Sequence, residues 1–216
     1  MKDAYQLVEQ FSRLAAADIG DSQDSRGIMD PELQPLDHRM KFAGVAVTVQ
    51  CAAGDQLPIH KAMAIARPGS VLVITGNVTA ECAMIGDLFA TMCKARGIRG
   101  MVLDGCCRDK ASLIEMGFPV FCKGLNLHKP ASKDPGAVNV PVCCGGVEVA
   151  PGDLVVGDAD GVVVIKQDEA EEVLQKAIQY EQMQENRRKQ CEQGKTTVEV
   201  MDLFDKLGMT PADLKG

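Results

Sequence analysis

The chain has 216 residues and a mass of 23.1 kDa, which is the size of a single domain. Its 30 acidic and 23 basic residues give a net charge of -7, which argues against a nucleic-acid-binding protein because such a protein needs a basic face. No apolar run approaches the roughly 20 residues of a membrane span, and the first residues lack the apolar stretch of a signal peptide. We therefore expect a cytoplasmic protein without nucleic-acid or membrane partners.

Hydrophobic periodicity predicts alternating helices and strands along the first part of the chain. Apolar residues at helical spacing over 5–14 predict a short helix, and the polar residues 18–22 are expected to cap a further one. The predicted strands cover residues 41–51, 70–75, 100–104 and 119–121. The predicted helices cover residues 58–66, 80–96 and 110–116, and each is followed by a glycine or proline turn.

From residue 138 onward the pattern changes to short strands separated by turns. These strands are predicted at 138–142, 147–150, 154–156 and 161–165. A long charged helix is predicted from Asp168 to about Gly194. Its apolar face consists of Ala170, Val173, Leu174, Ala177 and Ile178. Beyond Met183 the helix has little to bury, so this end is expected to project into solvent or, as we favour, onto a partner subunit.

Together these elements predict one α/β domain with mixed sheets and a long C-terminal helix. We divide the chain into an N-terminal helical segment (1–40), an α/β catalytic core (41–167) and a C-terminal helical segment that packs on a partner subunit (168–216).

The nine cysteines are odd in number and contain no C-x-x-C spacing. Most of them adjoin apolar residues, as in Phe121-Cys122 and Val142-Cys143, which is typical of small buried side chains in a reducing compartment. Burial of the thiols is the favoured interpretation, and a redox or zinc role is the alternative.

The densest group of chemically useful residues is the segment Asp104-Gly105-Cys106-Cys107-Arg108-Asp109, which follows an apolar strand. Ligands of α/β sheets gather beyond the carboxyl ends of strands, so a site is expected in this turn. The arginine fork suits a carboxylate, and one aspartate oxygen can hold Mg²⁺ while waters complete its coordination. In the alternative interpretation, Asp104 and Asp109 cap the next helix and Arg108 pairs with one of them.

A second strand end is expected to converge on the same place. The strand at 70–75 runs into Gly76, and the helix after it carries Gly86-Asp87-Leu88-Phe89. Backbone amides near a glycine can hold an anion. Asp87 is separated by 20 residues from Arg108-Asp109.

This D-x20-R-D arrangement resembles the family of class II 4-hydroxy-4-methyl-2-oxoglutarate/4-carboxy-4-hydroxy-2-oxoadipate aldolases, which also contains the regulator of ribonuclease activity A. Members of this family are often mislabelled as demethylmenaquinone methyltransferases. The resemblance extends, in order, over roughly residues 10 to 195. Its segments are 41–49, 67–73, 86–90, 102–109, 119–121, 138–142, 145–153 and 157–164.

The resemblance implies roles for individual residues. Asp109 would be the direct ligand of a divalent metal, Mg²⁺ or Mn²⁺, with waters filling most of its coordination sphere. Arg108 would bind an oxygen of a 2-oxo acid and stabilise its enolate. The backbone amides of Gly86, Asp87, Leu88 and Phe89 would hold the substrate carboxylate, and Asp87 would orient or deprotonate the water that serves as acid and base.

The resemblance also implies an assembly. Family members are homotrimers or homohexamers of a swivelling β/β/α fold, and carboxylates of a neighbouring subunit reach the site of the aldolases. Asp21 is the match to the first of these, although the aldolases have glutamate there. Glu185 is the match to the second, with Glu181 as the alternative.

The expected activity is metal-dependent retro-aldol cleavage of a 4-hydroxy-2-oxo acid to pyruvate, accompanied by oxaloacetate decarboxylation. One alternative is a lyase or decarboxylase acting on another 2-oxo acid. The other is a non-catalytic protein that binds and regulates an RNA-degrading enzyme.

Overall fold

A computed structural model of the chain describes residues 3–76 and 81–214. Its helices are α1 (Ala4–Phe11), α2 (Ala16–Ser22), α3 (Leu57–Ile65), α4 (Asp87–Ala95), α5 (Lys110–Met116), α6 (Ala170–Glu192), α7 (Thr197–Val200) and α8 (Phe204–Leu207), followed by a 3-10 turn (Pro211–Leu214). Its strands are β1 (Gln34–Pro35), β2 (Phe42–Cys51), β3 (Ser70–Gly76), β4 (Ala83–Ile85), β5 (Gly100–Cys107), β6 (Val120–Leu125), β7 (Ala137–Val138), β8 (Val142–Cys144), β9 (Val147–Val149), β10 (Leu154–Asp158) and β11 (Gly161–Ile165).

One mixed sheet organises the molecule, in the order β1-β6-β5-β3-β2-β10-β11. Strands β2, β3, β5 and β6 are parallel, whereas β10 pairs antiparallel with both β2 and β11. The sheet nearly closes on itself, because Ile28 bridges to Val163 at one edge and the chain then continues into β1 at the other. The predicted single α/β domain with mixed sheets and a long C-terminal helix is confirmed.

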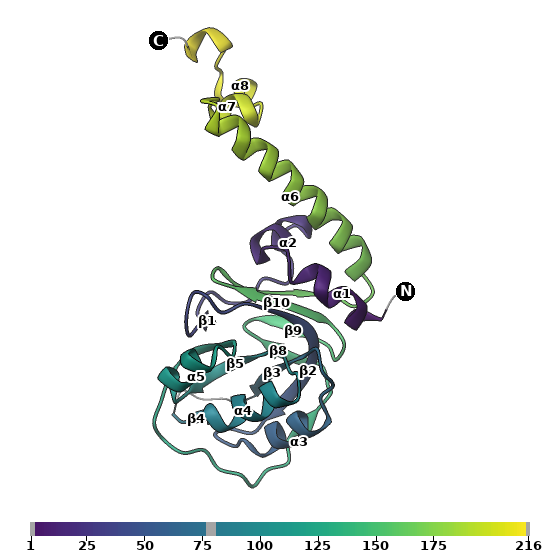
Figure 1. Cartoon of the computed structure of the whole chain (residues 1–216), viewed down its shortest axis with the longest axis vertical. Coiled ribbons are helices and arrows are strands. Elements are labelled where there is room, and N and C mark those ends of the chain that lie inside the picture. Colours follow the sequence, from purple (N-terminus) through teal and green to yellow (C-terminus); the bar gives the residue numbers. More distant parts are fainter. Residues whose placement is uncertain (1–2, 77–80, 215–216) are drawn as a thin grey trace.

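Helices α3, α4 and α5 cover one face of the parallel strands, in the lower part of Figure 1. Their apolar residues pack on side chains of β2, β3 and β5 such as Val49, Leu72 and Leu103, none of which is exposed to solvent. These strands are buried on both faces and therefore read as almost continuous apolar runs in the sequence. The parallel strands and their covering helices form the frame that carries the candidate site.

Helices α1, α2 and α6 form a second layer above the antiparallel part of the sheet (Figure 1). The expected apolar face of α6 is confirmed, since Val173, Leu174 and Ala177 are buried against α1, α2 and the sheet. The polar residues 18–22, predicted to cap a helix, lie instead inside α2 itself.

Several strand and helix predictions are wrong in their bounds, including the strand predicted over 119–121, which is β6 and continues to Leu125. The helix predicted over 80–96 begins only at Asp87, because Ala83–Ile85 forms strand β4; Ala80 lies outside the described residues. The strand predicted to end at residue 104 continues to Cys107. The strand predicted over 138–142 is divided between β7 and β8, since Asn139 has a positive φ of 58° that interrupts extended backbone.

All nine cysteines are free thiols, and seven of them are buried, which confirms the favoured interpretation for most of them. Cys143 and Cys191 are exposed, so burial was wrongly inferred for Cys143 from its apolar neighbour Val142. Alternation along β8 explains this, because Cys143 faces outward between two buried residues.

The C-terminal part of α6 and the helices after it form an arm that extends away from the body (Figure 1). The apolar residues Met183, Met201 and Leu207 on this arm are exposed to solvent. No helix in the described part of the chain is both long and apolar enough to span a membrane.

Asp153 anchors the turn before β10 and gives a test of the fold. Asp153 is only 3% exposed to solvent. Its carboxylate accepts hydrogen bonds from the backbone N–H groups of Ala150 (2.8 Å) and Gln167 (3.2 Å), and it forms an ion pair with Lys166 (3.0 Å). Asp153→Asn removes the charge and turns an amide NH₂ toward N–H donors, so we expect a loss of about 2–4 kcal/mol in the free energy of unfolding.

Urea unfolding would measure this loss as a lower midpoint at an unchanged m-value. The matched control is Asp160→Asn on the exposed turn between β10 and β11, which should change the free energy of unfolding by less than about 0.5 kcal/mol. Equal stability of the two variants would contradict the anchoring role of Asp153.

Candidate functional site

Strands β4 and β5 lie parallel and end side by side, with Ile85 opposite Cys107. The N–H of Arg108 donates to the carbonyl oxygen of Ile85 at 3.1 Å, which ties the two strand ends together. Asp87 follows the first strand and Asp109 follows the second. The parallel pairing therefore brings Asp87 and the pair Arg108-Asp109 to the same edge of the sheet, although 20 residues separate them in the sequence. Ligands of α/β sheets bind at this edge.

Asp109 lies at the centre of this cluster and has an unusual backbone conformation. Its φ of 59° and ψ of 35° are left-handed, a region that aspartate and asparagine tolerate better than most residues. Its side chain does not cap α5, the helix that it precedes. Instead, Oδ2 accepts a hydrogen bond from the N–H of Asp87 at 3.2 Å and lies 3.5 Å from Nε of Arg108.

The alternative interpretation, in which Asp109 caps the helix that follows it and Arg108 forms an ion pair, is therefore confirmed only for the ion pair. Arg108 does pair with Asp109, but the carboxylate serves the first turn of α4 rather than of α5. Both side chains remain accessible, with Arg108 42% and Asp109 35% exposed. Oδ1 of Asp109 has no hydrogen-bond or ion-pair partner among the residues that the structure describes.

Gly86 makes room for the Asp109 carboxylate. A Cβ atom at position 86 would lie 2.3 Å from Oδ2 of Asp109 and 3.3 Å from Cγ of Arg108. The first distance is far below any van der Waals contact, so no side chain fits at position 86 with the carboxylate in place. Glycine is required here for close approach rather than for an unusual backbone angle.

The first turn of α4 presents backbone N–H groups beside the carboxylate. The N–H groups of a first helical turn have no acceptor within the helix, and the positive end of the helix dipole lies there. The N–H of Asp87 is occupied by Asp109, which leaves those of Leu88 and Phe89 for a bound anion. The Leu88 side chain is 74% exposed, whereas Phe89 turns inward and contacts the ring of His60.

Asp104 does not belong to the cluster, although the sequence placed it in the same turn. It lies within β5, and its carboxylate bonds Nζ of Lys123 at 2.8 Å and the N–H of Gly145 at 3.1 Å. The hydrogen bond to Asp104 raises the pKa of Lys123. The expected turn is strand as far as Cys107, so Asp104 serves the structure and not the site.

The residues behind the cluster are apolar and tightly packed. Cys107, immediately before Arg108, is buried, and its Sγ lies 3.5 Å from Sγ of Cys122 on β6. The thiol–thiol contact and burial raise the pKa of Cys107, and the same contact lowers that of Cys122. This packing fixes the strand end from which Arg108 and Asp109 emerge.

The donor set at the cluster fits a hard divalent cation held by one carboxylate. Oδ1 of Asp109 is accessible and unpartnered among the described residues, which suits a Mg²⁺ or Mn²⁺ ion that keeps most of its waters. No group of three or more His, Cys, Asp or Glu side chains in the described part of the chain could enclose a metal. The site therefore suits an open ion rather than a structural zinc.

The carboxylates expected from a neighbouring subunit lie elsewhere in this chain. Asp21 is exposed on α2, and Glu185 on α6 pairs with Arg188 and Lys189 of the same helix. Glu181 and Glu185 line one groove of about 660 Å³ at the base of the arm. Figure 1 shows α2 and α6 above β10, whereas α4 and α5 lie in the lower part of the body, so neither residue approaches the cluster within one chain.

Two functional details were not found from the sequence. Gly86 stands directly before the first residue of α4, and a glycine at a strand–helix junction is the signal that could have indicated a close approach. The second is Asp158, whose carboxylate accepts a hydrogen bond from the N–H of Ala16 at 2.8 Å and so fixes the first turn of α2.

Comparisons with known proteins show what the chain is similar to as a whole. A family model described as RraA-like, Aldolase/RraA, matches residues 16–164. A protein of Halalkalibacterium halodurans, provisionally named 4-hydroxy-4-methyl-2-oxoglutarate aldolase, is 41% identical over 171 residues, which are 79% of this chain and 81% of that protein.

Two solved structures share the fold. An uncharacterised protein from Pseudomonas syringae superposes with a TM-score of 0.80 at 28% identity, covering 91% of this chain and 92% of that one. A Streptomyces coelicolor protein, described as an unusual member of the RNase ES inhibitor RraA protein family, has a TM-score of 0.74 at 32% identity and covers 85% of this chain and 96% of that one.

Proposed function

This chain belongs to the RraA-like family of aldolases and RraA proteins, and on that premise we propose that it is a metal-dependent lyase of 2-oxo acids. The proposed reaction is retro-aldol cleavage of a 4-hydroxy-2-oxo acid, such as 4-hydroxy-4-methyl-2-oxoglutarate, to pyruvate. Decarboxylation of oxaloacetate is proposed as a companion activity, because it passes through the same pyruvate enolate.

The observation that carries the proposal is the convergence of Asp87, Arg108 and Asp109 at one sheet edge. Cleavage of a 2-oxo acid requires a site for its carboxylate, a positive charge near the oxygen that becomes an enolate, and an acid–base group. The N–H groups of Leu88 and Phe89, the guanidinium of Arg108 and the carboxylate that Asp87 carries at the start of α4 would meet these three needs.

The roles of the residues follow from their positions. Asp109 would hold a Mg²⁺ or Mn²⁺ ion, which would supply Lewis-acid polarisation of the 2-oxo group. The N–H groups of Leu88 and Phe89 would bind the substrate carboxylate, and Arg108 would stabilise the enolate oxygen as negative charge develops there.

Asp87 would act on the proton of the C4 hydroxyl, which must leave when the C3–C4 bond breaks. Its side chain is half-buried at the start of α4, and its carbonyl oxygen is held by the hydroxyl of Thr91 at 2.8 Å. This fixes the backbone from which the carboxylate extends. Asp87 would accept the hydroxyl proton through a water, and the enolate would then be protonated to give pyruvate.

We propose that the complete site forms in a homotrimer or homohexamer. The cluster is open in one chain, with Arg108 42% exposed and Leu88 74% exposed, so a neighbouring subunit has room to close it. Asp21 and Glu185, with Glu181 as the alternative, are the residues proposed to reach the site of a neighbour, because within one chain α2 and α6 lie far from α4 and α5.

Pyruvate release tests the proposal directly. We expect turnover of oxaloacetate or 4-hydroxy-4-methyl-2-oxoglutarate only when Mg²⁺ or Mn²⁺ is present, with loss of activity on chelation and recovery when the ion is restored. The ratio of the two rates separates aldolase from decarboxylase. The proposal would be contradicted by turnover that does not need the metal ion. It would also be contradicted if the folded protein turned over neither these two substrates nor any other 2-oxo acid.

A binding function is the second candidate, since one protein of this fold is described as an unusual member of an RNase inhibitor family. It predicts that the chain inhibits an RNA-degrading enzyme without metal and that Asp109→Ala does not affect this inhibition. The lyase proposal predicts instead that pyruvate release requires both the metal ion and Asp109. Assays of pyruvate release and of RNase inhibition, each with and without metal, therefore decide between the two functions.

A further inference from the structure

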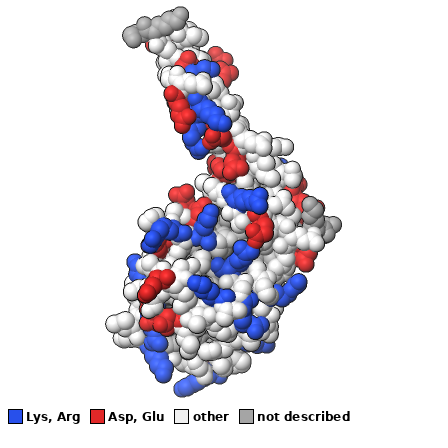
Figure 2. Space-filling model, viewed as in Figure 1, with Lys and Arg blue, Asp and Glu red and all other residues white. Residues whose placement is uncertain are grey.

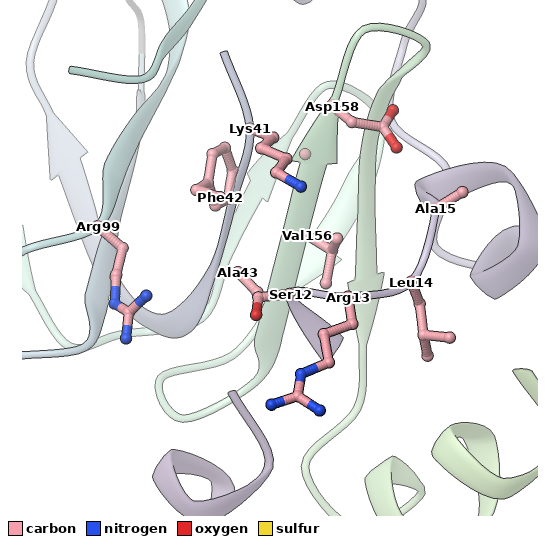
Figure 3. Close-up of a pocket in the computed structure, with 11 residues that line it drawn as sticks. Ser12, Arg13, Leu14, Ala15, Lys41, Phe42, Ala43, Arg99, Val156 and Asp158 are labelled. Atoms are coloured by element: carbon pink, nitrogen blue, oxygen red, sulfur yellow. The ribbon is translucent and has the colours of Figure 1, made fainter. Parts of the chain in front are cut away.

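A second candidate site lies at the opposite ends of the strands. A groove of about 780 Å³ runs between the end of α1, the start of β2, the residue before β5 and the end of β10. It lies at the amino ends of β2 and β5, whereas the cluster of Asp87, Arg108 and Asp109 lies at the carboxyl ends. We call this hollow the basic groove, after its lining side chains Arg13, Lys41 and Arg99 (Figure 3).

The positive charges of the basic groove are largely uncompensated. Arg13 and Lys41 are exposed, and among the described residues neither side chain has a hydrogen-bond or ion-pair partner. Arg99 is paired with Glu9, which lies outside the lining of the groove. Arg13 and Lys41 therefore leave a local excess of positive charge on a chain whose net charge is -7.

The acidic member of the lining is already engaged. Asp158 accepts hydrogen bonds from the N–H of Ala16 at 2.8 Å and from that of Asp160 at 3.0 Å, one on each carboxylate oxygen. It therefore does not neutralise the cations by direct pairing. Figure 3 shows Val156 of β10 between the side chains of Lys41 and Arg13; this residue is buried and belongs to the core beneath the groove.

We propose that the basic groove binds a small polyanion. Such a ligand carries several carboxylate groups on a short carbon chain, or phosphate groups joined as in pyrophosphate. The planar guanidinium of Arg13 is suited to two parallel hydrogen bonds with such a group, and Lys41 adds a point charge on the other side. Figure 2 shows more basic than acidic side chains over the body on the face drawn, whereas acidic and basic side chains alternate along the arm.

Calorimetric titration of the full chain tests the proposal, with citrate as the carboxylate probe and inorganic pyrophosphate as the phosphate probe. The protein is first freed of divalent metal and kept at low ionic strength. The test variant is Arg13→Gln/Lys41→Gln. The matched control is Lys61→Gln/Lys133→Gln, which removes two exposed charges outside the groove, and Arg108→Gln tests the other site.

We expect at least one probe to bind the wild-type protein. The Kd of that probe should be about tenfold higher, or more, for the test variant. Both the control and Arg108→Gln should change Kd by less than about twofold. Preference for citrate assigns carboxylates, preference for pyrophosphate assigns phosphates, and equal binding supports their shared charge. Absence of binding of both probes at millimolar concentration overturns the proposal, as does weakening in the control or in Arg108→Gln equal to that in the test variant.

Discussion

Replacement of Asp109 by asparagine is expected to lower kcat for pyruvate release by about a thousandfold in the presence of Mg²⁺ or Mn²⁺. Asparagine keeps the shape of the side chain but removes the negative charge that would hold the ion. It also suits the left-handed backbone at this position, and its side-chain oxygen can still accept the hydrogen bond from the N–H of Asp87. The loss should therefore be chemical and not a result of unfolding.

Thermal unfolding and steady-state kinetics on the same samples separate these causes. Asp104→Asn is the matched control, because Asp104 is a second carboxylate of the same strand–turn segment but bonds Lys123 and the N–H of Gly145. It should lower Tm and leave kcat of the folded protein within about twofold of the wild type. A fully active Asp109→Asn enzyme would show that this carboxylate does not serve the reaction.

Replacement of Gly86 by alanine is expected to lower kcat by about a hundredfold, although position 86 has no side chain to contribute. The new Cβ would lie 2.3 Å from Oδ2 of Asp109, so the carboxylate or the strand end must move by about 1 Å. A displacement of this size at a reacting centre costs about a hundredfold in rate. Weaker binding of the activating ion should accompany the loss, measured from kcat against metal concentration.

Gly124→Ala on β6 is the matched control, because its Cβ would meet only Sγ of Cys106, at an ordinary contact distance of 3.4 Å. It should change kcat by less than about twofold. Since Gly86→Ala is expected to act through Asp109, it should have little further effect on an Asp109→Asn enzyme. Additive losses in the double variant would show that Gly86 acts by another route.

The sequence was most informative where a single element determines its own pattern. The valine-rich strand β2 and the apolar strand β3 are found almost to the residue, because strands buried on both faces leave a continuous apolar run. The buried stripe of α6 is found for the same reason, since Val173, Leu174 and Ala177 recur at helical spacing.

Strand β4 was missed because its three residues, Ala83–Ile85, are compatible with either a helix or a strand. What makes them a strand is the pairing of Ile85 with Cys107, a contact between residues 22 positions apart that local periodicity does not contain. The same pairing extends β5, so Asp104 lies in a strand although its polar side chain and the glycine after it indicated a turn.

The candidate site was predictable in its members but not in its contacts. The proximity of Asp87 to Arg108 and Asp109 was expected, but the strand that positions Asp87 was not, because β4 rather than β3 directly precedes it. That the Asp109 carboxylate binds the first turn of α4 and occupies the space left by Gly86 depends on the register of β4 against β5. That register is decided by packing of the whole sheet rather than by any local pattern.

The arm has a consequence for how this protein behaves in solution. Helix α6 has 23 residues, a length of about 35 Å at 1.5 Å per residue, and it carries α7 and α8 beyond the body. An elongated particle diffuses more slowly and elutes earlier from a sizing column than a sphere of equal mass. If the arm projects from the assembly as it does from one chain, column calibration with compact standards overstates the number of subunits; if it packs on a partner subunit, the column agrees with light scattering or sedimentation equilibrium.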